Sequence, residues 1–205
     1  MNPSEIFDKH KEVNPSIITI GTFDGMHKGH ISLLTEMTKL ANDLIPIVIS
    51  FNRPPKDVIN KKDSKMILQL TDKKRMIEEI GIDKLITINF NSEIQELDCK
   101  DFIKILKDSL NMEVLTLGEG TLLGKDRKGY KNGLIEILND FDASLIPISN
   151  KKDKESKISS SQIKKSILEG DIGKVNSLLG RNFSISGKVV EGEKIGSTIG
   201  YPTAN

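Results

Sequence analysis

The chain has 205 residues, a nearly balanced net charge of +1 and one cysteine, Cys99. This length suits one α/β domain with some additional chain. The charge balance excludes a broad basic surface for nucleic acid, and no apolar segment is long enough to span a membrane. A lone cysteine cannot form an internal disulfide, and the first residues lack the apolar core of a signal peptide. We therefore expect a cytoplasmic protein whose partners are neither nucleic acids nor membranes.

Short apolar segments alternate with helix-periodic segments along most of the chain. Strands are predicted at residues 17–22, 45–50, 85–89, 114–117 and 145–149. Helices are predicted at residues 31–44, 71–80, 100–110 and 133–140. The alternation indicates an α/β fold, a Rossmann-like parallel sheet with helices on both faces. Ligands of such sheets bind beyond the carboxyl ends of the strands, so we expect loops 21–30, 51–55 and 118–129 to meet there.

The first predicted strand ends at Gly21, and two of the three histidines of the chain follow in the loop before a helix. If the helix begins near Gly29, its unpaired N–H groups and positive dipole end lie beside His27 and His30. Gly29 has no Cβ, so a phosphate can approach the backbone closely. The two imidazoles could stabilise the charge that develops during transfer at phosphorus. An isolated histidine pair would more often be solvated, but the strand–loop–helix context favours the functional interpretation.

The string Gly-Thr-Phe-Asp-Gly-Met-His-Lys-Gly-His at residues 21–30 resembles the FAD synthetase domain of bacterial bifunctional riboflavin kinase/FAD synthetases. That domain belongs to the nucleotidylyltransferase superfamily. The resemblance implies transfer of AMP from ATP to FMN, giving FAD and pyrophosphate, with His27 and His30 as catalytic residues. It also implies Mg²⁺ with the ATP, although no residue is assigned as a metal ligand. Further ATP contacts implied by the resemblance are Gly21, Phe23, Asp24 and Gly29. Asp24 could equally cap a turn.

A serine run, Ser159–Ser161, precedes a further predicted helix. Its hydroxyl and N–H groups could bind the β- and γ-phosphates of ATP, or could belong to an ordinary capped helix. The resembled family carries a similar run that ends in arginine, and Lys164 stands at that position. The resemblance therefore implies that Ser160, Ser161 and Lys164 bind ATP. Lysine keeps the charge of arginine but loses its bidentate fork.

The glycines of loop 118–129 permit a ligand to approach the backbone, although a flexible surface loop has the same composition. The resemblance implies flavin contacts at Asn52, Gly118, Gly120 and Thr121. Thr121 and Leu123 replace two aromatic residues of the family's loop. This departure leaves two alternatives open: a nucleotidylyltransferase with a different phosphate acceptor, or an inactive nucleotide- or flavin-binding remnant.

The resemblance divides the chain into residues 1–182, the FAD synthetase-like domain, and residues 183–205, a truncated beginning of the riboflavin kinase module. Residues 183–190 are predicted as a strand, and residues 187–205 as a glycine-rich hairpin that ends in Pro-Thr-Ala-Asn. One or two strands cannot close a β-barrel. We therefore expect an incomplete barrel start without riboflavin kinase activity.

Overall fold

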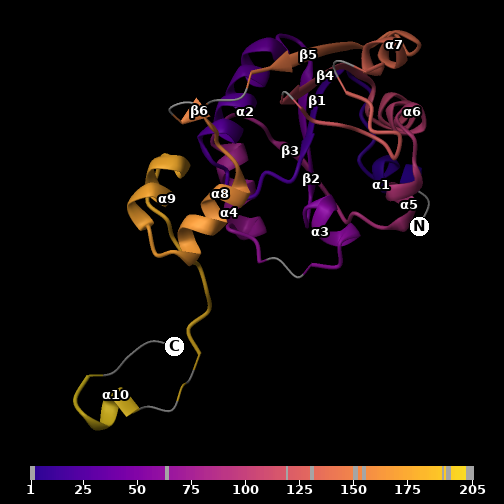
Figure 1. Ribbon diagram of the computed structural model, residues 1–205. Helices are drawn as coiled ribbons and strands as arrows, with labels where there is room; N and C mark the ends of the chain where they lie inside the picture. Colours follow the sequence, from indigo (N-terminus) through magenta and orange to yellow (C-terminus); the bar gives the residue numbers. More distant parts are fainter. Residues whose placement is uncertain are drawn as a thin grey trace.

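The computed structural model describes residues 3–62, 65–118, 120–129, 132–149, 152–153, 156–190, 192 and 195–201. Its centre is a parallel five-stranded sheet with the strand order β3-β2-β1-β4-β5 (Figure 1). The strands are β1 (Ser16–Gly21), β2 (Ile45–Phe51), β3 (Lys84–Ile88), β4 (Met112–Gly118) and β5 (Ser144–Ile148). All five lie where the sequence predicts strands, with small shifts at their ends. The predicted α/β fold is confirmed.

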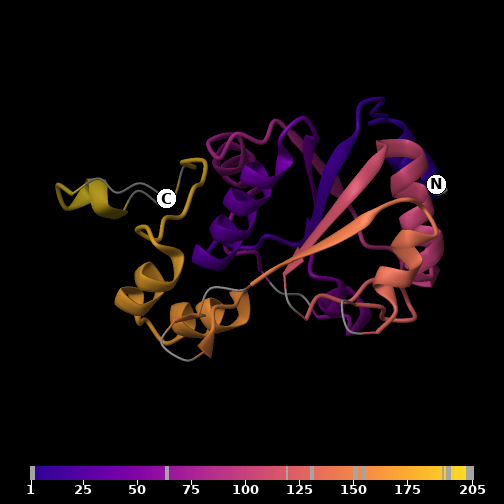
Figure 2. The ribbon, with the colours of Figure 1, turned by 90° about the horizontal axis from the view of Figure 1, so that it is seen from above.

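Helices cover both faces of the sheet (Figure 2). On one face lie α2 (Lys28–Ala41) and α4 (Leu70–Glu78), and on the other lie α1 (Pro3–Asp8), α6 (Cys99–Leu110) and α7 (Leu134–Asn139). The short helices α3 (Pro55–Ile59) and α5 (Ser92–Glu96) follow β2 and β3. The four long predicted helices are confirmed. Helices α1, α3 and α5 were not predicted, because one or two turns are too short to show a helical period.

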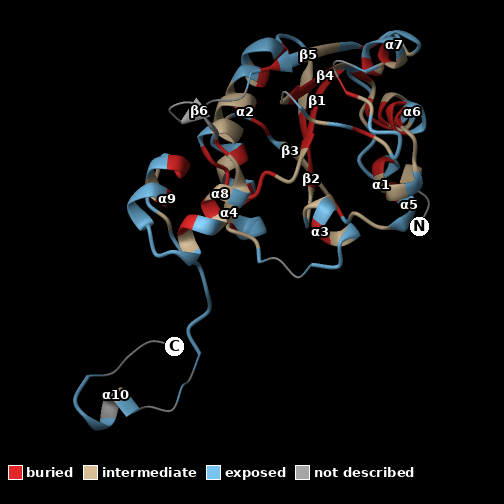
Figure 3. Ribbon diagram, in the orientation of Figure 1, coloured by how far each residue is buried: buried red, intermediate tan, exposed pale blue. Residues whose placement is uncertain are grey.

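The strands are apolar along their whole length because both faces are covered. Ile18 and Ile20 of β1 pack towards α1 and α6, whereas Ile17 packs against α2. Buried residues accordingly concentrate in the strands and on the inner faces of the helices (Figure 3). This packing fixes the carboxyl ends of β1, β2 and β4, where the candidate site lies.

After the sheet comes a short antiparallel pair, β6 (Lys152–Asp153) and β7 (Ser156–Lys157). The helices α8 (Ser160–Leu168) and α9 (Ile172–Leu179) then form a small core of their own around Ile163 and Val175. No helix in the described part of the chain is long and apolar enough to cross a membrane.

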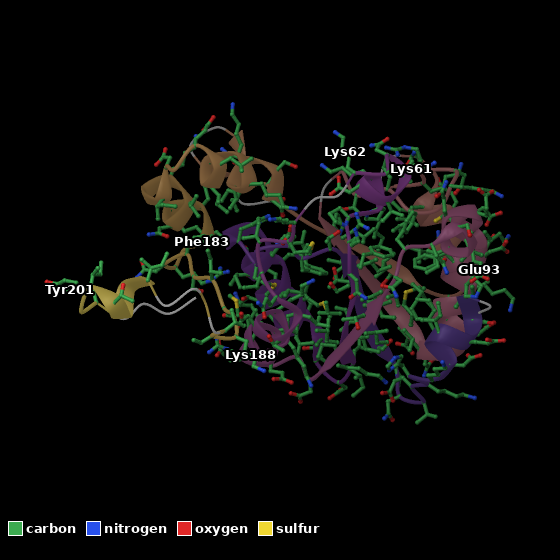
Figure 4. The ribbon with its side chains drawn as sticks, turned by 90° about the horizontal axis from the view of Figure 1, so that it is seen from below. Lys61, Lys62, Glu93, Phe183, Lys188 and Tyr201 are labelled. Carbon is green, nitrogen blue, oxygen red and sulfur yellow. The ribbon has the colours of Figure 1, made fainter. Side chains whose placement is uncertain are left out.

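The strand and the hairpin predicted within residues 183–205 are not found among the described residues of this segment. The described residues 183–190 form no strand, and the predicted hairpin is replaced by the helix α10 (Ile195–Thr198). A strand needs a second backbone to pair with, and Ile185 is 86% exposed with no ladder partner among the described residues. Ser186 still contacts α4, since its hydroxyl donates to Asp72 at 3.0 Å, whereas Tyr201 lies far from the sheet (Figure 4). Residues 202–205, the Pro-Thr-Ala-Asn motif, lie outside the described residues.

Candidate active site

The loop between β1 and α2 is held in shape by two buried apolar side chains. Phe23 and Met26 have left-handed φ angles of 49° and 41°, with Gly25 at 80° between them. A left-handed residue other than glycine costs about 1–2 kcal/mol. Both side chains are buried in the cluster that α2 and α4 form with the sheet. Burial of each side chain stabilises the fold by about 1.5–3 kcal/mol. Packing therefore offsets the strain of the turn.

His27 and His30 are stacked at the start of α2. Their ring centroids are 3.7 Å apart with an interplanar angle of 16°. His27 is the N-cap residue, and its Nδ1 accepts a hydrogen bond of 3.3 Å from the backbone N–H of His30. Because Nδ1 is the acceptor, a neutral His27 carries its proton on Nε2. A Cβ at Gly29 would lie 3.1 Å from Nδ1 of His27, so glycine at this position makes room for the ring.

Asp24 joins the β1–α2 loop to α8. Its buried carboxylate accepts a 2.7 Å hydrogen bond from the N–H of Ile67 and forms a 2.8 Å ion pair with Lys164. The hydroxyl of Ser160 donates to the backbone carbonyl of Asp24 at 2.8 Å. Two of the predicted phosphate ligands, Ser160 and Lys164, thus contact a residue that was itself predicted to bind ATP. The predicted serine cap of α8 is confirmed, since Ser159 accepts from the N–H of Gln162.

These residues surround a cavity of about 690 Å³ at the carboxyl ends of β1 and β4. We call it the histidine cavity. Every catalytic and ATP-binding residue predicted from the sequence lies in its lining, namely Gly21, Phe23, Asp24, His27, Gly29, His30, Ser160, Ser161 and Lys164. Lys56 of α3 also lines it, and its Nζ donates to the hydroxyl of Ser161 at 3.2 Å. In the view of Figure 4, Lys61 and Lys62 lie at the end of α3, and Lys62 also lines the histidine cavity.

A second, smaller cavity of about 300 Å³ lies between α3, α5 and loop 120–127. We call it the apolar pocket, because most of its wall is hydrocarbon. Phe51 and Phe90 meet in it edge to face, with ring centroids 5.6 Å apart. The other apolar side chains in its wall are Pro55, Ile59, Ile94, Leu97, Phe102, Leu122 and Leu123.

The structure does not bring the four predicted flavin residues together. Gly118 and Thr121 line the histidine cavity. The side chain of Asn52 instead donates to Oδ1 of Asn89 at 2.8 Å. A Cβ built on Gly120 would meet nothing within 4 Å, so this position faces open space. None of the four lines the apolar pocket, whereas Leu122, Leu123, Gly124, Lys125 and Arg127 of the same loop do.

Five basic residues around the site were not predicted from the sequence. Lys56, Lys62 and Lys165 line the histidine cavity, and Lys73 and Arg181 bind backbone carbonyls of the β1–α2 loop. Lys73 sits among several lysines and acidic residues of α4, so its sequence neighbours give no sign that it is buried. The only available signal for Lys56 is its position just after β2, at the edge of the sheet where ligands bind.

A parallel sheet with two histidines at the first strand–helix turn defines an α/β protein of the nucleotidylyltransferase-like class. A solved structure described as a macrolide-efflux protein from Streptococcus pneumoniae shares this fold, with a TM-score of 0.82 and 30% identity over 97% of this chain and 66% of that one. The pantoate-beta-alanine ligase of Francisella tularensis shares the fold more distantly, with a TM-score of 0.51 and 18% identity over 93% of this chain and 89% of that one.

Within this class, the chain belongs to the FAD synthetase family, which matches residues 9–162. The riboflavin kinase family matches residues 179–205. The bifunctional riboflavin kinase/FMN adenylyltransferase of Buchnera aphidicola from Schizaphis graminum is 38% identical over 95% of this chain, which covers 64% of that protein. The enzyme of the same name from Bacillus subtilis is 33% identical over 95% of this chain, which covers 63% of that protein. The chain therefore spans just under two thirds of the curated relatives it matches.

Proposed function

We propose that this chain is an FMN adenylyltransferase, which transfers AMP from ATP to FMN. A phosphate oxygen of FMN attacks the α-phosphorus of ATP, the bond to the oxygen bridging the α- and β-phosphates breaks, and pyrophosphate leaves. The nucleophile is already an anion, so the reaction needs no strong general base. Catalysis then depends on positioning and on stabilising negative charge at the transferred group.

The observation that carries this proposal is the histidine stack at the N-terminus of α2. The stack lies in a cavity with room for a nucleotide. His27 and His30 can donate hydrogen bonds to the oxygens of the α-phosphate, and the first N–H groups of α2 add their positive dipole end. Ser160, Ser161 and Lys164 then bind the β- and γ-phosphates. For Lys164 this requires exchanging the carboxylate of Asp24 for a phosphate oxygen.

The apolar pocket is the proposed seat of the isoalloxazine ring. α3 and loop 118–129 contribute residues to both this pocket and the histidine cavity, so one molecule of FMN can extend across them. Its ring packs between Phe51, Phe90 and the aliphatic side chains of the loop. Its phosphate passes Asn52, Gly118 and Thr121 towards the histidines, with Gly120 at the turn. Ligand pockets of a few hundred Å³ with apolar walls commonly hold such rings.

We propose that Mg²⁺ accompanies ATP and neutralises the charge of its phosphates. Among the described residues, no group of three His, Cys, Asp or Glu side chains is placed to hold a metal ion. Mg²⁺ keeps several waters and binds largely through substrate phosphates. No protein ligand is assigned to it.

The direct test is incubation of the purified chain with ATP, FMN and Mg²⁺, with FAD and pyrophosphate both quantified. We expect equal amounts of the two products. Pyrophosphate release with AMP in place of FAD would contradict FMN as the acceptor, since the AMP group would then have passed to water. Binding of ATP or FMN, measured by calorimetry, without formation of either product would instead indicate an inactive nucleotide- or flavin-binding remnant.

A further inference from the structure

Three backbone carbonyls of the β1–α2 loop are bound by cationic side chains from distant parts of the chain. Nζ of Lys73, in α4, donates to the carbonyl of Thr22 at 2.9 Å. Nη1 and Nη2 of Arg181 donate to the carbonyls of Met26 and Gly25 at 2.9 and 2.7 Å. A loop that is to bind phosphate has to present N–H groups to it, because carbonyl oxygens repel an anion.

Lys73 is buried without an ion pair in the described part of the chain. It is only 2% exposed, and besides Thr22 it contacts the hydroxyl of Ser50 at 3.0 Å. That hydroxyl in turn lies 3.1 Å from the same carbonyl of Thr22. Burial lowers the pKa of Lys73, and the negative charge of Asp24 opposes this shift. A buried cation that lacks an ion pair costs stability, so a positional role accounts for it better than a purely stabilising one.

Arg181 holds the loop from the end of α9. It follows Gly180, the left-handed residue that ends α9 with a φ of 77°. A Cβ at Gly180 would lie 3.0 Å from the side chain of Lys28, so the end of α9 rests directly on the start of α2. Arg181 therefore reaches the two left-handed residues that precede His27.

We infer that Lys73 and Arg181 are positioning residues for phosphoryl chemistry at the histidine cavity. Neither side chain lines that cavity, so the carbonyls that bind them are turned away from it. The N–H groups of the loop and the rings of His27 and His30 are left to face the phosphate. The inference rests on the proposed adenylyl transfer, but the geometry it assigns can be tested without any substrate.

The test uses Lys73→Met and Arg181→Met, with Lys74→Met and Arg75→Met as matched controls. The side chains of Lys74 and Arg75 are 63% and 69% exposed in the same helix as Lys73. We expect kcat for FAD formation to fall on the order of 10- to 100-fold in each test variant, the scale of a misplaced reacting group. We expect the Kd for ATP to change much less. The melting temperature of Lys73→Met should be retained or raised, since a buried charge is removed. The two controls should behave as the wild type.

The second readout is the NMR spectrum of the imidazoles, which is easily assigned because the chain has three histidines. The signals of His27 and His30 should shift in both test variants. The signals of His10, which follows α1 on the other face of the sheet, should not shift. If Lys73→Met does not fold, Ser50→Ala removes one of its partners without changing charge and should shift the same two histidines.

Unchanged His27 and His30 signals in the test variants, or an unchanged kcat, would overturn the positioning role. A wild-type chain that makes no FAD would overturn the proposed function and leave the imidazole test intact. Equal shifts of all three histidines would show a general structural effect and contradict the inference.

Discussion

The two loops at the carboxyl edge of the sheet are held in different ways. The β1–α2 loop is fixed by long-range polar contacts, with Lys73, Lys164 and Arg181 all reaching it from distant helices. Loop 118–129, which we call the acceptor loop, is held by a bridge of its own between Leu123 and Lys128 and by two hydrogen bonds to the nearby α5–α6 junction. The N–H of Lys125 donates to the carbonyl of Leu97, and the N–H of Cys99 donates to Oδ1 of Asp126, each at 2.8 Å. We infer that the β1–α2 loop, which we call the rigid loop, is held more firmly, because its contacts come from three separate segments whereas those of the acceptor loop come from one.

The largest effect should come from the histidines in the rigid loop. We predict that His27→Ala and His30→Ala each lower kcat for adenylyl transfer by roughly 100-fold or more, the scale of one lost transition-state donor. ATP affinity should change much less. His10→Ala is the matched control. A double variant of His27 and His30 with wild-type turnover would remove the catalytic assignment and, with it, the contrast between the two loops.

The next effect concerns Lys164, which bridges α8 and the rigid loop. We predict that Lys164→Ala weakens ATP binding by about 1–3 kcal/mol, the cost of a lost charged hydrogen bond, and that Lys164→Arg keeps or tightens it. Titration calorimetry measures both. The control is Lys174→Ala, since Lys174 is exposed in α9 and does not line the histidine cavity. Equal ATP affinity in the wild type and Lys164→Ala would reduce α8 to a capped surface helix.

In the acceptor loop, Gly124 and Gly120 form a natural pair for comparison. Both have left-handed φ angles, of 69° and 82°, so alanine is strained at either position. Only at Gly124 would the new Cβ also clash, at 2.3 Å from the backbone nitrogen of Cys99. We predict that Gly124→Ala displaces the loop and weakens FMN binding on the order of tenfold, whereas Gly120→Ala has a smaller effect.

Flavin fluorescence during titration with the protein would report this difference. The Kd for ATP should stay constant in both variants. Equal losses of FMN affinity in Gly124→Ala and Gly120→Ala would show that backbone strain, and not the clash with Cys99, causes the loss. A parallel loss of ATP affinity would contradict the expectation that the change stays within the acceptor loop.

The smallest effect concerns Cys99, beneath the acceptor loop. Burial, reinforced by Asp126 and Asp98, raises the pKa of its thiol from 9.0 to about 12. The folded protein at pH 8 therefore holds almost no thiolate, and we predict slow labelling by thiol reagents until the chain unfolds. Rapid labelling at pH 8, with native activity retained, would show that the acceptor loop opens.

The same pKa shift makes stability depend on pH. Between pH 9.0 and about 12 the unfolded thiol loses its proton before the folded one does. The folded state binds more protons in that window, so this group's contribution to the free energy of unfolding falls as pH rises. Denaturant titrations at several pH values, compared with Cys99→Ala, would isolate the contribution.

The sequence by itself determined the parallel sheet, the long helices and the histidine turn at the first strand. Each of these depends on contiguous residues: an apolar run, a helical period, or glycine and histidine at fixed spacing. The serine cap of α8 was predictable for the same reason, since Ser159 and Gln162 are near neighbours in the chain.

Tertiary structure alone decided how the site is held and where the chain leaves the sheet pattern. The contacts of Thr22 with Lys73 and of Met26 with Arg181 join residues 51 and 155 positions apart, and nothing in local sequence encodes such a pairing. The predicted strand at residues 183–190 failed for a related reason. Its β-branched residues favour an extended chain, but a strand forms only where another backbone supplies the hydrogen bonds. The residues of a segment set its local conformational preference, and the elements packed against it in the tertiary structure determine the conformation it adopts.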